Sequence, residues 1–155
     1  MISEAEFKEK LEMGVAGEDR IYPWLKEHNE WVDDCRRQKY KDGGGPRMVG
    51  SKGSIVIPDF IVHNESGDNF AVDVKVKKKV YLIDGKYYFT VDKKFEDYIK
   101  VVRIKKLDYL AIIFIYNDKM YFYKDSDLSR ITVYNNQYST GNVYCFSYDK
   151  SKVVC

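Results

Sequence analysis

The sequence has few of the residues that build covalent or zinc-bound frameworks. Its 155 residues include three cysteines, two histidines and three prolines. The cysteines are odd in number and far apart, and their spacing matches neither a zinc site nor a disulfide framework. This usage is typical of a protein that works in a reducing cytosol. The fold must therefore be held by a hydrophobic core, which a composition of 45% hydrophobic residues can supply.

Long hydrophobic runs and a charge of one sign are also missing. The longest apolar run, Tyr109 to Tyr116, is far too short to span a bilayer, and the N-terminal residues are charged from Glu4 onward, unlike a signal peptide. We therefore expect no membrane association and a cytoplasmic location. Abundant Lys, Tyr, Ile and Asn with little Ala and Pro suit an AT-rich genome, so the expected setting is bacterial, or that of a phage protein in the host cytoplasm. The 26 Lys and Arg nearly cancel the 24 Asp and Glu, so net charge alone does not indicate a nucleic-acid partner.

The hydrophobic pattern predicts one domain, residues 1–155, with helices and strands interspersed. Ser3 starts a helix as part of a capping box, and Phe7, Leu11 and Val15 mark one face of that helix. The expected elements are a helix over the first thirty residues, an irregular glycine-rich segment at 33–54, strands at 54–62 and 69–78, a hairpin at 81–90, a helix at 92–106, and strands at 109–116, 120–124, 131–134 and 143–148. This order predicts an α/β fold in which a mixed central sheet is flanked by helices.

The residues that carry chemistry lie in two neighbouring strands. Asp59 interrupts a run that is apolar on both faces, and Asp73 and Lys75 lie in the next run. Side chains two residues apart in a strand point to the same face, so Asp73, Lys75 and Lys77 share one face. A buried carboxylate needs a partner, because burying an unpaired charge is very unfavourable. For Asp59 we expect that partner to be a metal ion or Lys75.

The acids fit a hard divalent cation. Carboxylates such as Asp59 and Asp73 suit Mg²⁺ or Mn²⁺, which keep positions open for a water and a phosphate oxygen. Lys75 would neutralise the charge on the phosphate or position the attacking water. A third carboxylate from the N-terminal helix would complete the site, and we choose Glu18 because it follows Gly17, which permits close approach of another group. The alternative is that Glu18 is a solvated helix residue.

Glu18, the Pro58-Asp59 pair and Asp73-Val74-Lys75 together resemble the motif of the PD-(D/E)XK nuclease superfamily. Its members include archaeal Holliday junction resolvases, type II restriction enzymes and many phage nucleases. The similarity spans residues 14–116 and implies a restriction-endonuclease-like fold, with a helix ahead of a hairpin that carries the acids. The chain departs from the resolvases at Asp73, where they favour Glu, although the superfamily pattern accepts either acid.

The resemblance also implies roles for these positions. The metal ligands would be the side chains of Glu18, Asp59 and Asp73 and the main-chain carbonyl of Val74, and Lys75 would be the lysine of the motif. The implied function is Mg²⁺-dependent endonuclease hydrolysis of DNA, structure-selective in the manner of a Holliday junction resolvase and acting on branched DNA. Symmetric cutting of two strands needs two active sites, so a homodimer is expected.

Further residues are candidates for contacts with the DNA backbone. Arg47, Ser51 and Lys52 lie in the glycine-rich segment, and Lys77 begins a lysine run after the motif. The glycine-rich segment is equally typical of a plain flexible connection, and the lysine run is equally typical of a charged strand edge. Two rival functions stay open: a non-catalytic DNA-binding or protein-interaction module on the same fold, and a nuclease that acts on RNA.

Overall fold

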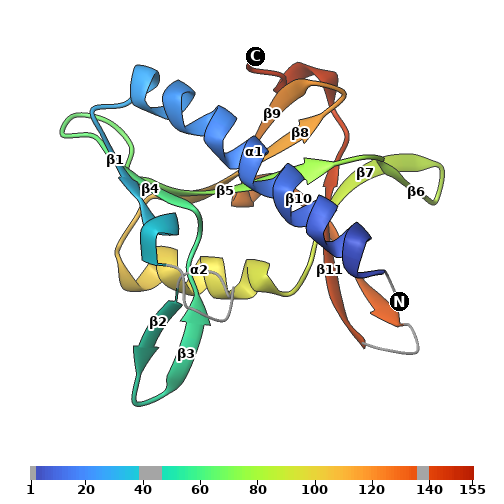
Figure 1. The fold of residues 1–155 in the computed structure, drawn as a ribbon, viewed down its shortest axis with the longest axis horizontal. Helices are drawn as coiled ribbons and strands as arrows, with labels where there is room; N and C mark the ends of the chain where they lie inside the picture. Colours follow the sequence, from blue (N-terminus) through green and yellow to red (C-terminus); the bar gives the residue numbers. More distant parts are fainter. Residues whose placement is uncertain (1–2, 39–46, 136–139) are drawn as a thin grey trace.

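The computed structural model describes residues 3–38, 47–135 and 140–155. The described part contains a long helix, α1 (Glu4–His28), and a shorter one, α2 (Lys94–Ile104) (Figure 1). The strands are β1 (Trp31–Asp34), β2 (Arg47–Gly50), β3 (Gly53–Val56), β4 (Phe60–His63), β5 (Phe70–Lys77), β6 (Tyr81–Ile83), β7 (Lys86–Val91), β8 (Tyr109–Tyr116), β9 (Lys119–Lys124), β10 (Leu128–Asn135) and β11 (Thr140–Ser147). Short 3-10 turns are η1 (Cys35–Gln38), η2 (Asp125–Asp127) and η3 (Lys150–Lys152).

A five-stranded sheet in the order β1-β4-β5-β8-β9 forms the centre of the fold. β5 and β8 run parallel along their whole length, from Phe70 opposite Tyr109 to Lys77 opposite Tyr116, while the other neighbours are antiparallel. β8 is apolar on both faces, as expected for a central strand that is covered on both sides. The predicted α/β class, with a mixed central sheet and flanking helices, is therefore confirmed.

Helix α1 covers one face of the central sheet and crosses it obliquely (Figure 1). Ile21 and Leu25 are fully buried and pack with the valine face of β5, including Val72 and Val74. Pro23 lies inside this one continuous helix and does not start a second one. The burial of Ile21 and Leu25 fixes the second half of α1 against the sheet.

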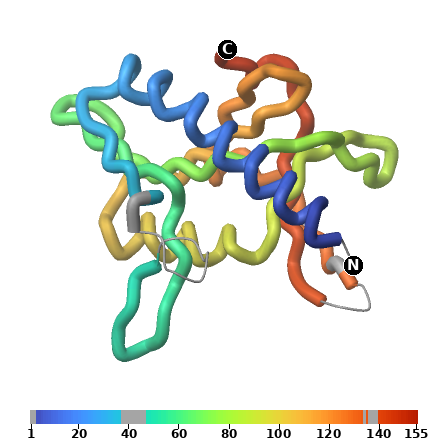
Figure 2. The backbone as a smooth tube through the Cα atoms, viewed as in Figure 1, coloured from blue at the N-terminus to red at the C-terminus, as the bar shows by residue number. Residues whose placement is uncertain are grey.

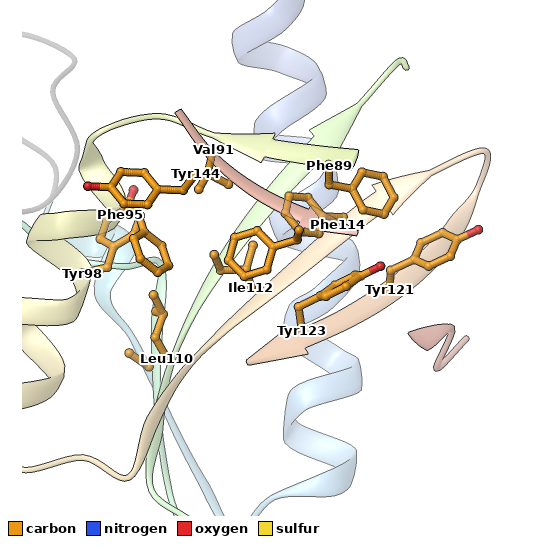
Figure 3. Packing of buried hydrophobic residues seen from close by; sticks show 12 residues of the cluster. Phe89, Val91, Phe95, Tyr98, Leu110, Ile112, Phe114, Tyr121, Tyr123 and Tyr144 are labelled. Atoms are coloured by element: carbon orange, nitrogen blue, oxygen red, sulfur yellow. The ribbon is translucent and has the colours of Figure 1, made fainter. Parts of the chain in front are cut away.

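The opposite face is covered by α2 and by a second sheet, which was not predicted as a separate layer. This four-stranded sheet has the order β10-β11-β7-β6. Phe89 of β7 stacks on Phe114 of β8 with ring centroids 4.5 Å apart, and Phe95 of α2 packs against Tyr144 of β11 at 4.7 Å. Figure 3 shows these aromatic side chains together between the two layers. Because aromatic rings bury large apolar areas, they make the second sheet an integral part of the core.

The segment predicted to be irregular, residues 33–54, contains regular structure, so that prediction was wrong. β1 pairs with β4 at the edge of the central sheet, and β2 and β3 form a separate hairpin that projects from the rest of the chain (Figure 2). Each of these strands has four residues, which is too short for a clear alternation of polar and apolar positions. Residues 39–46, which include Gly43, Gly44 and Gly45 of the segment predicted to be irregular, lie outside the described residues.

Other local predictions are confirmed. The hairpin at 81–90 turns at Asp84 and Gly85, whose φ angles of 49° and 81° are those that an Asp-Gly hairpin turn requires. Helix α2 lies within the expected range 92–106; it begins at Lys94 with Lys93 rather than Asp92 as the N-cap residue, and the Asp92 side chain accepts a hydrogen bond from Lys94 N at 2.9 Å. Across the three described stretches, we find no helix whose length and apolar character would let it cross a membrane.

Candidate functional site

The candidate site forms where the pairing between β4 and β5 stops. The last paired residues are Phe60 and Val72, and continuing the register would place Pro58 opposite Val74. Proline has no backbone N–H, so it cannot complete that pair. The Asp59 side chain instead accepts a hydrogen bond from Val74 N, with Oδ2 2.9 Å from the nitrogen. In a hydrogen-bonded antiparallel pair, the N–H and the C=O of one residue point toward the same neighbouring strand. The Val74 carbonyl therefore faces the same opening as the Val74 N–H.

Asp73 and Lys75 of β5 lie beside this opening and form an ion pair. Lys75 Nζ lies 3.0 Å from Asp73 Oδ2. Asp73 is 3% exposed, and among the described residues its Oδ2 has no partner with the geometry of a hydrogen bond. A buried carboxylate oxygen in this state has capacity for a further cationic ligand.

The charges of the site shift the pKa values of its groups. Burial, followed by the negative charges of Asp73 and Glu18, raises the pKa of Asp59 well above its ordinary value. Burial favours the neutral form of Lys75, but the Asp73 carboxylate outweighs it, so the pKa of Lys75 is raised and the ammonium stays charged. The acids of the site therefore repel one another, with one lysine between them.

Glu18 reaches the site because α1 approaches β5 closely at the preceding residue. A Cβ added to Gly17 would lie 2.4 Å from Val76 Cγ2, so a larger residue would hold the helix away. Glu18 is held by Arg36, whose Nη1 lies 3.7 Å from Glu18 Oε1. The same guanidinium forms ion pairs at 2.8 Å with Asp19 and with Asp34. Arg36 is thus a site residue that the sequence analysis did not identify.

The predicted catalytic and metal-binding residues line one cavity of about 700 Å³. Its lining includes Glu18, Asp59, Asp73, Val74, Lys75 and Lys77. These residues come from α1, from the segment between β3 and β4, and from β5, so the fold brings together residues separated by up to 59 positions in sequence. A cavity of this size is in the range of small-molecule and cofactor sites.

The donor set of the cavity suits a hard cation. In the described stretches, no three His, Cys, Asp or Glu side chains are already gathered closely enough to hold a metal ion. The oxygen ligands that could do so are the carboxylates of Asp59 and Asp73 and the carbonyl of Val74, with Glu18 next to them on α1. The buried Asp73 Oδ2, whose contact with Lys75 lacks the geometry of a hydrogen bond, and the raised pKa of Asp59 both indicate a place where further positive charge would be stabilised.

Comparison with known proteins identifies the fold. Neither a known protein family nor a curated protein sequence matches the chain. Among solved structures, it is similar to a Holliday junction resolvase from the archaeal hyperthermophile Archaeoglobus fulgidus, with a TM-score of 0.55 over 90% of this chain and 85% of that protein. The chain has a resolvase-like fold. Sequence identity is 14%, so the likeness concerns the fold, and it extends beyond residues 14–116.

The predicted DNA-contacting residues fall in two different places. Lys77 lines the main cavity, where burial, followed by the charge of Lys75, lowers its pKa to about 8. Arg47, Ser51 and Lys52 lie on the β2–β3 hairpin and do not line that cavity. Lys52 lines a second cavity of about 450 Å³ between this hairpin and α2. Contact of these residues with DNA stays a prediction.

Tyr98 is a second residue of the site; its place on the predicted helix allows it to face the cleft, but packing was the expected role. It lies on α2, is 5% exposed, and lines the main cavity with Lys94 one turn before it. Lys75 Nζ lies 5.8 Å from the centre of the Tyr98 ring. Burial and the charge of Asp73 raise the pKa of Tyr98, so its hydroxyl stays protonated and can donate a hydrogen bond. The i, i+4 spacing of Lys94 and Tyr98 was visible, but it is also typical of an ordinary helix face.

Proposed function

We propose that the protein is a metal-dependent endonuclease that hydrolyses DNA phosphodiester bonds and selects its substrate by structure, as a Holliday junction resolvase does. The observation that carries the proposal is the interrupted ladder between β4 and β5. It places Asp59, Asp73, Lys75 and the Val74 carbonyl at the wall of one cavity. The resolvase-like fold adds support, since the resemblance to the PD-(D/E)XK superfamily rests on the same residues.

The residues divide the work between holding a cation and receiving a phosphate. Asp59, Asp73 and the Val74 carbonyl would hold Mg²⁺ or Mn²⁺, with Glu18 as a further carboxylate once it separates from Arg36. The bound cation would supply Lewis-acid chemistry: a water of lowered pKa and neutralisation of charge on the phosphate. Lys75, kept charged by Asp73, would stabilise the negative charge that develops on the phosphate oxygens.

The proposal extends to assembly and setting. Cutting two strands symmetrically needs two active sites, so we propose that residues 1–155 act as one domain within a homodimer. The proposed place of action is the cytoplasm of a bacterium or of a phage-infected host.

The direct test is cleavage of DNA in the presence and absence of a divalent cation. Purified protein should cut branched DNA with Mg²⁺ or Mn²⁺, and EDTA should abolish the cutting. Asp73→Asn and Lys75→Ala should each lower the rate at least about 100-fold, because each removes a charge that acts on the reacting phosphate. Asp118→Asn is the matched control: Asp118 is exposed, pairs with Arg20 outside the cavity, and should leave the rate unchanged.

Two results would reject this function. Absence of cleavage on linear, flap, fork and four-way junction DNA with either cation would favour a non-catalytic binding module. Faster cleavage of RNA than of DNA with the same sequence would favour the RNA nuclease. Calorimetric titration with Mn²⁺ separates the first case further, because a non-catalytic module need not bind the ion through Asp59 and Asp73.

A further inference from the structure

One line of residues on α1 is buried at the C-terminal end of the helix and exposed at the N-terminal end. Its members are spaced alternately by four and three residues, so they lie on one face. Toward the C-terminal end of α1 this face is packed on the sheet, and Ile21 and Leu25 are 0% exposed. Toward the N-terminal end it has no cover in the described chain, and Leu11 and Phe7 are 53% and 56% exposed. The line consists of Phe7, Leu11, Gly14, Glu18, Ile21 and Leu25.

Part of the open stretch, though not Phe7, lies at the candidate active site. Leu11, Gly14 and Val15 line the same cavity as Asp59 and Asp73. An exposed Phe7-Leu11-Val15 face was not expected, because such a stripe is typical of a helix face packed on a core. We define the cleft wall as Leu11, Gly14 and Val15.

Cationic and aromatic side chains line the cavity together with the cleft wall. They include Lys77 and Lys79, which follow the catalytic motif, and Tyr81 at the start of β6. The ammonium of Lys79 lies 4.9 Å from the centre of the Tyr81 ring. One cavity therefore offers apolar surface, an aromatic ring and positive charge beside the carboxylates.

Gly14 has no structural reason within the described chain. A Cβ added at Gly14 would meet nothing within 4 Å, whereas one at Gly17 would collide with Val76. Glycine inside a helix is destabilising by about 0.5–1 kcal/mol relative to alanine. The missing side chain leaves open space within the cleft wall, in the cavity that the acids of the candidate site also line.

We infer that the cavity takes a DNA strand whose bases are unpaired, with phosphates on Lys77 and Lys79 and bases against Tyr81 and the cleft wall. A duplex presents its phosphates outward and keeps the faces of its bases stacked, so it cannot use an apolar wall next to the scissile phosphate. An unpaired strand presents both, and aromatic and apolar side chains bind its base faces regardless of sequence. Gly14 supplies the room that a base needs. The inference rests on the proposed function and names its substrate: DNA with a single-stranded segment at the cut.

The test measures the effect of one substitution on two quantities, the thermal stability of the protein and its affinity for DNA. Gly14→Leu fills the open space and also removes a glycine from a helix. It should therefore raise the midpoint of thermal unfolding, yet weaken the binding of a duplex with a single-stranded tail by at least about fivefold, the low end for losing one base contact. Binding is measured by fluorescence anisotropy in EDTA, so that no cleavage occurs, with a blunt duplex of the same length in parallel. The affinity for the blunt duplex should not change.

Two further variants complete the design. Ala16→Leu adds the same side chain on an exposed position of α1 that does not line the cavity, and it should leave both affinities unchanged. Leu11→Ser, at an exposed position, should weaken tailed DNA in the same way and keeps the test valid if Gly14→Leu fails to fold.

The remaining outcomes would overturn either the inferred ligand or the proposed nuclease function. Equal loss on tailed and blunt DNA, or no loss on either, overturns the inference. A change in molar mass by light scattering for Leu11→Ser would identify the cleft wall as an interface between copies of the chain and also overturns it. Selective binding of tailed DNA without cleavage in Mg²⁺ or Mn²⁺ would reject the proposed nuclease while supporting the inferred ligand.

Discussion

Among single residues, Lys77 carries the pKa shift that is easiest to test. Burial, then the neighbouring charge of Lys75, lowers its pKa to about 8, whereas an unfolded lysine titrates near 10.4. Between these two values the unfolded chain binds more protons at this position than the folded chain. The free energy of unfolding contributed by Lys77 therefore rises with pH in that window, and the full penalty is present below pH 8.

Lys77→Met should remove this dependence, because methionine keeps the length of the side chain and has no charge to bury. We expect Lys77→Met to be more stable than the natural protein at pH 7, and the difference between the two to shrink by about 2 kcal/mol from pH 8 to pH 9.5. Urea unfolding at several pH values measures it. The difference is the required quantity, because Cys35, whose pKa is raised to about 12 mainly by burial, titrates in the opposite sense in both proteins. A constant difference would show that Lys77 is charged and well solvated in the fold.

Among the elements, α1 has two glycines that predict opposite results for the same substitution. Gly17→Ala places a Cβ 2.4 Å from Val76 Cγ2 and should lower the free energy of unfolding by about 1–3 kcal/mol, despite the better helix propensity of alanine. Gly14→Ala meets open space and should raise it by about 0.5–1 kcal/mol. Chemical denaturation of both variants gives the comparison directly. Stabilisation by both would mean that α1 does not approach β5 this closely.

The candidate site shows which functional residues could be predicted from the sequence and which could not. Glu18, Asp59, Asp73 and Lys75 were predicted as one site because strand alternation and a glycine before Glu18 are local signals, and they do line one cavity. Arg36 was missed because it lies in a charged run that looks solvated, and its role depends on contact with a helix formed much earlier in the chain.

A helix or strand could be predicted only where its own residues show a clear pattern of polar and apolar positions. β5, β8 and α1 are long enough to show theirs. β1, β2 and β3 are four residues long and are strands because of their partners. The second sheet was missed for a related reason: its strands were expected, but the aromatic residues that separate it from the central sheet have the same strand preference in either layer.

At the scale of the whole molecule, the main cavity is a region where buried charges lower the stability of the fold. Residues from both described helices and from each of the three described sheets line it, and burial together with the charges of Asp73 and Glu18 raises the pKa of Asp59. A carboxyl whose pKa is raised in the folded state stabilises the fold only while it is protonated. That contribution is lost as the pH rises through the raised value, so the ionised form of Asp59 destabilises the protein unless a cation is bound.

Asp59→Asn should therefore separate stability from metal binding. The amide oxygen can still accept the hydrogen bond from Val74 N, and the repulsion from Asp73 is removed, so in EDTA the variant should unfold at a higher temperature than the natural protein. Saturating Mn²⁺ should raise the unfolding temperature of the natural protein, because a ligand that binds only the folded state stabilises it, and should have a much smaller effect on the variant.

Asp118→Asn, at an exposed position outside the cavity, should behave like the natural protein in both conditions. Differential scanning calorimetry of the three proteins with EDTA and with Mn²⁺ makes the comparison. An equal Mn²⁺ response in all three would place the cation elsewhere, while a less stable Asp59→Asn protein in EDTA would mean that the Asp59 carboxylate is already neutralised within the fold.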